Sequence, residues 1–113
     1  MNPIEARIIL NSSIDTTFID ERDKLSSFKM QSGRELALIE ENKQKVSLYV
    51  EVYPCFMPEV IVEEEYIPQP KNVGRHSNLY YITSKLGFGN RAYRLHIKTK
   101  EGLELFLNWY KYA

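Results

Sequence analysis

Alternation of apolar and polar residues predicts the clearest strands of the chain. Over 46–53, valine or leucine occupies every second position, which is the period-two pattern of a half-buried antiparallel strand. Residues 92–98 alternate in the same way between apolar and basic side chains. Residues 60–66 predict a further strand, in which Val60, Val62 and Tyr66 share one face.

Weaker patterns place further elements in the first part of the chain. Two short apolar runs, 6–10 and 36–39, are predicted as strands. Asp20 is a residue type that caps helices, so we expect a short helix over about 21–29. A polar turn at 41–44 then leads into the next strand.

Apolar residues at helical spacing predict two helices in the second half of the chain. The segment 78–86 fits either a helix or a strand, and the glycine that follows it favours the helix. The last helix is expected to begin at about Lys100, with Thr99 as its cap. It is apolar on two opposite sides, so we expect burial on both, either inside the fold or against a partner chain.

Together these elements predict an α+β fold with an antiparallel sheet of about five strands, two or three helices, and the C-terminal helix packed on the sheet. The chain has 113 residues, of which 43% are hydrophobic and 27% charged, as is typical of an ordered globular domain. We expect residues 1–113 to form one domain, because neither half is long enough to bury its own core. The stretch 67–74 contains two prolines and a glycine and is predicted as an exposed connection.

Composition and targeting signals favour a cytoplasmic protein. No apolar run approaches the roughly 20 residues needed to cross a bilayer, and the first residues lack the basic and apolar regions of a signal peptide. Cys55 is the only cysteine, which excludes an internal disulfide and favours a reducing compartment. We therefore expect a cytoplasmic location and no membrane partner.

The two halves of the chain carry opposite charge, although the net charge is zero. Residues 1–66 contain 13 acidic and 7 basic side chains, whereas residues 67–113 contain 2 acidic and 8 basic ones. Such asymmetry is a hint of a surface that binds a polyanion.

The leading hypothesis is a non-catalytic module that binds DNA or RNA. Arginine and lysine neutralise phosphates, while asparagine, histidine and arginine form hydrogen bonds with base edges. The predicted contact residues are Arg75, His76, Asn78, Arg91, Arg94, His96 and Lys98. Aromatic residues interleaved with them offer rings that stack on unpaired bases, and these are Tyr80, Tyr81, Phe88 and Tyr93.

A structural role for the same basic residues is the competing interpretation. Arg94 and Lys98 can lie across the sheet from Glu63 and Glu65 and form cross-strand ion pairs. The sequence contains no zinc-finger spacing, no RNP-type aromatic signature and no convincing helix-turn-helix. Both interpretations of the basic residues therefore stay open at this point.

The sequence shows no arrangement typical of catalysis or metal binding, so we lean away from an enzyme. Gly87-Phe88-Gly89 lies between a predicted helix and a strand, whereas phosphate-binding loops need a strand, a turn and then a helix. The acidic run 63–65 lies on a strand, where consecutive side chains alternate between faces and do not converge on one ion. Cys55 and His76 lack an orienting third group at recognisable spacing. We expect no catalytic residue, no metal and no cofactor.

Aromatic residues support an alternative functional hypothesis. The chain has eight tyrosines and one tryptophan, and these residue types, with arginine, dominate the energetics of protein interfaces. If exposed, they imply a protein partner or a homodimer. If buried, they show only that both faces of the sheet are covered. The alternative function is a protein-interaction module or inhibitor, with an interface formed by Tyr49, Tyr53, Leu105, Trp109 and Tyr112.

Overall fold

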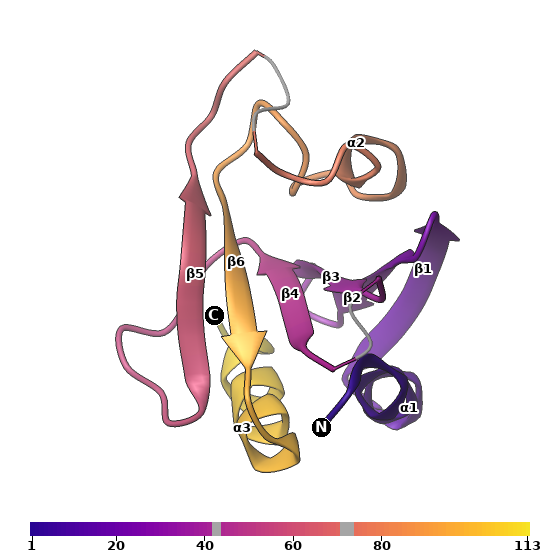
Figure 1. Ribbon diagram of the computed structural model, residues 1–113, viewed down its shortest axis with the longest axis vertical. Coiled ribbons are helices and arrows are strands. Elements are labelled where there is room, and N and C mark those ends of the chain that lie inside the picture. Colours follow the sequence, from indigo (N-terminus) through magenta and orange to yellow (C-terminus); the bar gives the residue numbers. More distant parts are fainter. Residues whose placement is uncertain (42–43, 71–73) are drawn as a thin grey trace.

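A computed structural model of the chain describes residues 1–41, 44–70 and 74–113 (Figure 1). Within these residues, six strands form one antiparallel sheet in the order β1-β2-β3-β4-β6-β5, accompanied by three helices. The predicted α+β class and the packing of the last helix on the sheet are confirmed. The elements are α1 (Pro3–Ser12), β1 (Thr16–Arg22), β2 (Leu25–Met30), β3 (Glu35–Ile39), β4 (Val46–Val50), β5 (Val60–Tyr66), α2 (Leu79–Ile82), β6 (Ala92–Ile97) and α3 (Lys100–Tyr110).

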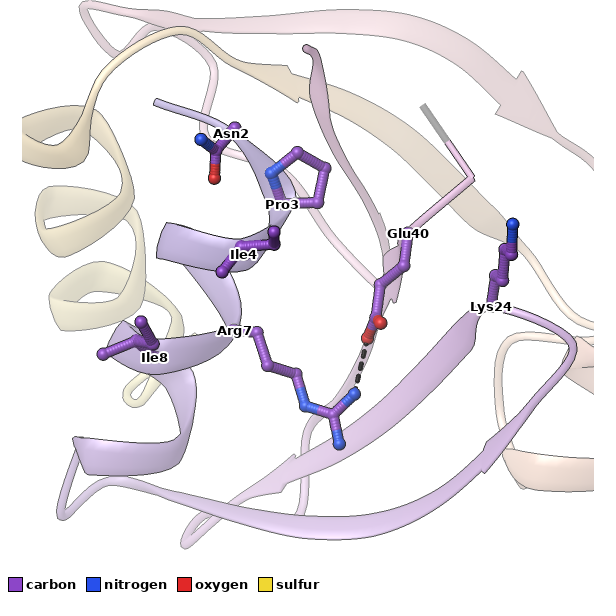
Figure 2. A pocket seen from close by; sticks show the side chains of 7 residues that line it. All are labelled: Asn2, Pro3, Ile4, Arg7, Ile8, Lys24 and Glu40. Atoms are coloured by element: carbon purple, nitrogen blue, oxygen red, sulfur yellow. Dashed lines mark hydrogen bonds and ion pairs between the residues drawn. The ribbon is translucent and has the colours of Figure 1, made fainter. Parts of the chain in front are cut away.

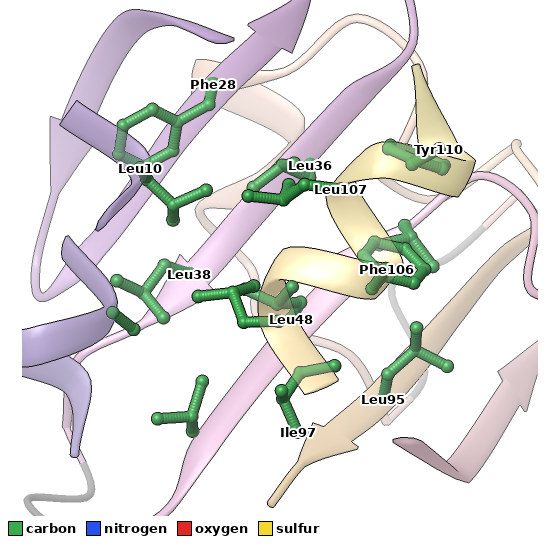
Figure 3. Close-up of a cluster of buried hydrophobic side chains, with 14 of the residues drawn as sticks. Leu10, Phe28, Leu36, Leu38, Leu48, Leu95, Ile97, Phe106, Leu107 and Tyr110 are labelled. Atoms are coloured by element: carbon green, nitrogen blue, oxygen red, sulfur yellow. The ribbon is translucent and has the colours of Figure 1, made fainter. Parts of the chain in front are cut away.

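Strand β4 lies at the centre of the fold, and all five of its residues are buried. Its valines and leucine face α1 and α3, where they join the larger apolar core (Figure 3). Tyr110 of α3 closes this core at one end, because its hydroxyl donates a hydrogen bond to the Glu35 carbonyl and accepts one from the Glu51 N–H. Tyr49 points to the opposite side, where Leu79 and other residues of the α2 region form a second apolar core.

The strand predicted at 6–10 is wrong, because these residues belong to helix α1. Asn2 caps this helix by accepting a hydrogen bond from the Glu5 N–H at 2.9 Å, and proline occupies the first turn. Ala6 and Leu10, four residues apart, are buried against the sheet. The apolar run is therefore part of a helix with one buried side.

The helix predicted at 21–29 is also wrong, because the segment belongs to a hairpin of β1 and β2. Asp23 and Lys24 form the turn with φ angles of 48° and 62°, and two such residues give the tight turn whose twist matches the flanking strands. Asp20 lies within β1 and does not cap a helix. β2 is buried along its length except at Lys29, so it lacks the alternation by which strands are recognised.

The strand predicted at 60–66 is confirmed as β5, but a β-bulge changes which residues share a face. Val62 lies opposite Leu95, which belongs to the larger core, and the register shifts before Glu64. Tyr66 consequently lies opposite Ala92 and joins the second core, so it does not share a face with Val62 as expected.

The remaining elements follow the sequence patterns with changed boundaries. The strand expected over 46–53 ends at Val50, and the helix expected over 78–86 is limited to Leu79–Ile82. α3 begins at Lys100 as predicted, and the Thr99 side chain caps it by accepting a hydrogen bond from Gly102 at 3.1 Å.

Two predicted connections fall partly outside the described residues. These are the turn at 41–44, of which 42–43 are not described, and the connection at 67–74, of which 71–73 are not described. In the part of the chain that is described, no helix is long and apolar enough to cross a membrane.

The start of α3 packs closely against the turn that precedes β5. Glu59 in this turn has a positive φ of 67°, and its carbonyl accepts a hydrogen bond from the Lys98 N–H at 2.8 Å. A Cβ atom added at Gly102 would lie 2.9 Å from the Glu59 Cβ. The helix therefore needs glycine at this position.

We predict that Gly102→Ala lowers the free energy of unfolding by about 1–3 kcal/mol, because overpacking outweighs the roughly 1 kcal/mol by which alanine is preferred in helices. Urea denaturation measures this loss. Glu59→Gly removes the facing Cβ and relieves the positive φ, so adding it to Gly102→Ala should restore stability. A more stable Gly102→Ala protein would contradict the close packing.

Candidate functional site

Arg75, the first predicted nucleic-acid contact, is only 7% exposed. Its guanidinium donates hydrogen bonds to the carbonyl oxygens of Leu86 and Gly87, both at 2.8 Å, and of Ile67 at 3.2 Å. Burial lowers the pKa of this guanidinium. Arg75 thus ties the segment that carries α2 to the end of β5.

Tyr66 also contacts Arg75, whose guanidinium lies 4.9 Å from the centre of the Tyr66 ring. The Tyr66 hydroxyl donates a hydrogen bond to the Gly74 carbonyl at 3.0 Å and accepts one from Arg94 at 3.3 Å. Burial raises the pKa of Tyr66 to about 12. The hydroxyl therefore stays protonated at neutral pH and makes both hydrogen bonds.

His76 and Asn78 also form contacts within the chain. The Asn78 amide donates a hydrogen bond to the Asp23 carboxylate at 3.1 Å. The backbone N–H of His76 donates a hydrogen bond to the Tyr49 hydroxyl at 3.1 Å. The ring Nε2 atom of His76 lies 3.0 Å from Glu41 Oε1. These contacts hold the segment before α2 against the sheet.

Arg91 and Arg94 pair with glutamates of β5. Arg91 Nη1 lies 2.5 Å from Glu65 Oε1, and Arg94 Nε lies 3.7 Å from Glu63 Oε1. Burial alone would raise the pKa of Glu63, but the hydrogen bond and charge of Lys45, with the charge of Arg94, hold it below its ordinary value. The cross-strand ion pair between Arg94 and Glu63 is thus present, whereas Glu65 pairs with Arg91.

His96 and Lys98 lie at the end of β6 that is remote from Arg75. His96 is half-buried and Lys98 is exposed. Neither side chain has a hydrogen bond or ion pair within the ranges that the structure describes. The seven predicted contacts are therefore divided between two ends of the sheet, and Arg75 and Asn78 lie beneath the surface.

A different basic and aromatic surface lies over α2. Tyr80 and Tyr81 are 55% and 62% exposed, and their ring centres lie 5.4 Å apart in an edge-to-face arrangement. Phe88 stacks on Tyr80, with ring centres 4.7 Å apart. The Arg22 guanidinium lies 4.3 Å from the centre of the Tyr81 ring. We call Arg22, Tyr80, Tyr81 and Phe88 the α2 surface.

Glycine brings the two parts of this surface together. A Cβ atom at Gly87 would lie 2.8 Å from the Tyr80 Cα, so only glycine lets the turn approach α2 closely enough for Phe88 to stack on Tyr80. The sequence placed these rings among the basic residues but gave no sign of Arg22, which comes from the hairpin that was predicted as a helix.

The predicted protein-interface residues have different environments. Tyr49 is buried in the second core. Leu105 and Trp109 lie on one side of α3, as their spacing of four residues requires, and Tyr112 lies in the turn that follows the helix. Leu105 and Tyr112 are exposed, whereas Trp109 is half-buried and packs against Phe106.

The connection between β4 and β5 extends the apolar area beside α3. Tyr53 is exposed and packs against Tyr93, with ring centres 4.7 Å apart. Phe56 is 86% exposed, and Val62 of β5 is also exposed on the side of the sheet that α3 covers. We define the α3–β5 flank as Tyr53, Phe56, Val62, Leu105, Trp109 and Tyr112.

A pocket of about 450 Å³ lies beside α1 (Figure 2). Arg7 in this pocket donates hydrogen bonds to Glu40 at 2.7 Å, to Ser26 at 2.8 Å and to Glu21 at 3.2 Å. Burial opposes the charge of the guanidinium, but the two glutamates raise its pKa above the ordinary value. Arg7 and Glu40 at this pocket therefore pair with each other and join α1 to the sheet. The pocket is lined by Asn2, Pro3, Ile4, Arg7, Ile8, Lys24 and Glu40.

The chain was compared with protein-family models, curated proteins and solved structures, and none of these comparisons found a match. Within the described residues, no group of three or more histidine, cysteine, aspartate or glutamate side chains is arranged to hold a metal ion. Among the described residues, the α2 surface and the α3–β5 flank are the candidate binding surfaces.

We predict that Arg75→Met lowers the free energy of unfolding by about 2–4 kcal/mol, because it leaves buried carbonyl oxygens without a donor. Thermal and urea denaturation measure the loss. Arg91→Met is the matched control, because it removes an exposed ion pair worth at most about 1 kcal/mol. Unchanged stability together with lost nucleic-acid binding in Arg75→Met would contradict a structural role.

Proposed function

We propose that this protein binds single-stranded nucleic acid through the α2 surface. The observation that supports the proposal is the exposure of Tyr80 and Tyr81 side by side, next to Arg22. Exposed aromatic rings stack on unpaired bases, and arginine adds cation–π attraction and phosphate contacts. The predicted role of the basic and aromatic second half is retained, with a different set of contact residues.

Cations lie near these rings, together with the Asp20 and Glu35 carboxylates of the pocket that Tyr81 lines. Arg22, Lys29 and Lys85 are exposed, and none of them has an ion pair within the described part of the chain. Lys29 and Tyr81 line the same pocket. Three cations are enough to contact phosphates but imply modest affinity, with a salt slope of about −2 for a single strand.

The chemistry of this surface favours a single strand over a duplex. A duplex hides the faces of its bases in the stack, so exposed rings gain little from it. α2 is a four-residue helix, too short to act as a recognition helix in a major groove. Lys98 and His96 lie at the far end of β6 and are not required for this mode of binding.

Fluorescence anisotropy with labelled single-stranded DNA, RNA and duplex DNA tests the proposal. We predict that Tyr80→Ala and Tyr81→Ala each weaken single-strand binding by about 1–3 kcal/mol, because each removes a stacking platform. Tyr112→Ala is the matched control, because Tyr112 is 83% exposed but lies in the turn after α3 and does not belong to the α2 surface. Binding that is equal in all three variants, or absent in the wild type at low salt, would contradict the proposal.

A second function, protein interaction through the α3–β5 flank, is supported by the exposure of Phe56, Leu105 and Tyr112. Large exposed apolar side chains are enriched where proteins bind one another. The partner that requires no other component is a second copy of the chain, because most soluble oligomers are symmetric homodimers. We therefore propose a homodimer for this flank.

Sedimentation velocity over a range of protein concentrations tests the homodimer. We predict a dimer that tolerates salt, and a monomer when Leu105→Glu places a charge in the middle of the flank. Ile14→Glu is the control, because Ile14 is also exposed but precedes β1. A wild-type protein that stays monomeric at every concentration would exclude this interface.

A further inference from the structure

A polar pocket of about 280 Å³ adjoins the α2 surface. Tyr81 belongs to both, so a strand stacked on the α2 surface would pass the mouth of the pocket. One wall comes from the β1–β2 hairpin and the other from α2 and the residues that follow it. The lining residues are Ile19, Asp20, Lys29, Glu35, Tyr81, Ile82, Thr83 and Ser84.

A β-bulge directs Asp20 toward this pocket. Phe18 lies opposite Phe28, which belongs to the larger core on the other side of the sheet. The register then shifts, and Asp20 lies opposite Ser27. Bulges re-aim side chains in this way and are common beside functional sites.

The polar groups of the pocket differ in how many hydrogen bonds they form within the chain. The Glu35 carboxylate accepts hydrogen bonds from the Ser84 N–H at 3.0 Å through both oxygens, so it is held in place. One Asp20 oxygen accepts a hydrogen bond from the Glu21 N–H at 2.8 Å. The other Asp20 oxygen and the Lys29 ammonium have no partner among the described residues. Asp20 and Lys29 therefore offer an acceptor and a donor at the pocket.

We propose that this pocket receives one unpaired base and selects cytosine or adenine over thymine or uracil; the inference rests on the proposed single-strand binding. The amino group of cytosine or adenine donates to Asp20, and the adjacent ring nitrogen accepts from Lys29. Thymine and uracil carry a carbonyl oxygen in place of the amino group. This oxygen and the Asp20 carboxylate are both acceptors, so they form no hydrogen bond with each other. Tyr81 lies at the entrance and stacks on the inserted base or on its neighbour.

Anisotropy titrations with labelled dC and dT oligomers of equal length test this selection. We expect the wild type to bind the dC oligomer about tenfold more tightly than the dT oligomer. Asp20→Asn should reduce this ratio to about threefold or less, because an amide both donates and accepts and so pairs with either base. Glu64→Gln is the matched control, since it removes one exposed carboxylate from β5 and should leave the ratio unchanged.

The outcomes separate this inference from the proposed function. Equal binding of dC and dT by the wild type, or an unchanged ratio in Asp20→Asn, overturns the base pocket and leaves single-strand binding in place. Absence of binding to any oligomer overturns both. Thermal melting checks that Asp20→Asn is folded. If it is not folded, the wild type is tested by displacing a labelled oligomer with cytidine monophosphate or with thymidine monophosphate. Equal displacement by the two nucleotides overturns the selection.

Discussion

The burial of β4 on both faces is the constraint on which the rest of the structure depends. A strand with five buried residues needs cover on two sides. α1 and α3 supply one cover through the larger core, and the α2 region supplies the other. Since α2 has only four residues, apolar packing alone gives it little hold on the sheet. Buried hydrogen bonds supply the remaining attachment.

That attachment explains why basic residues of the second half lie inside the protein. Arg75 donates hydrogen bonds to carbonyl oxygens that precede and follow α2 in the sequence. The Asn78 amide donates one to Asp23 in the turn between β1 and β2. A guanidinium suits this task, because it offers several donors in a rigid fork. Once these polar groups hold the segment in place, the tyrosines of α2 are left facing solvent. Exposed rings on an anchored helix are suited to stacking with a flexible ligand, because the protein loses little conformational entropy on binding.

Local patterns predicted those parts of the fold that local physics controls. The strands β4 and β6, predicted from alternation, and the Thr99 cap of α3 depend on neighbouring residues only, and they are confirmed. The expectation that β4 is half-buried is wrong, because the α2 region covers its second face. The β1–β2 hairpin was missed because its turn uses Asp23 and Lys24 without glycine, and because the β2 sequence does not alternate regularly between apolar and polar residues. The position of Arg75 could not be predicted from its residue type, since its burial is decided by carbonyl oxygens that are distant in the sequence.

We propose that the α2 surface, and not the end of β6, contacts single-stranded nucleic acid. Amide chemical-shift mapping by NMR, with a short single-stranded oligomer added to labelled protein, tests it most directly. The account predicts shifts concentrated at Tyr80, Tyr81, Phe88 and Arg22, with little change at Lys98. Shifts confined to the end of β6 or to α3, or no shifts at a saturating oligomer concentration, would contradict it.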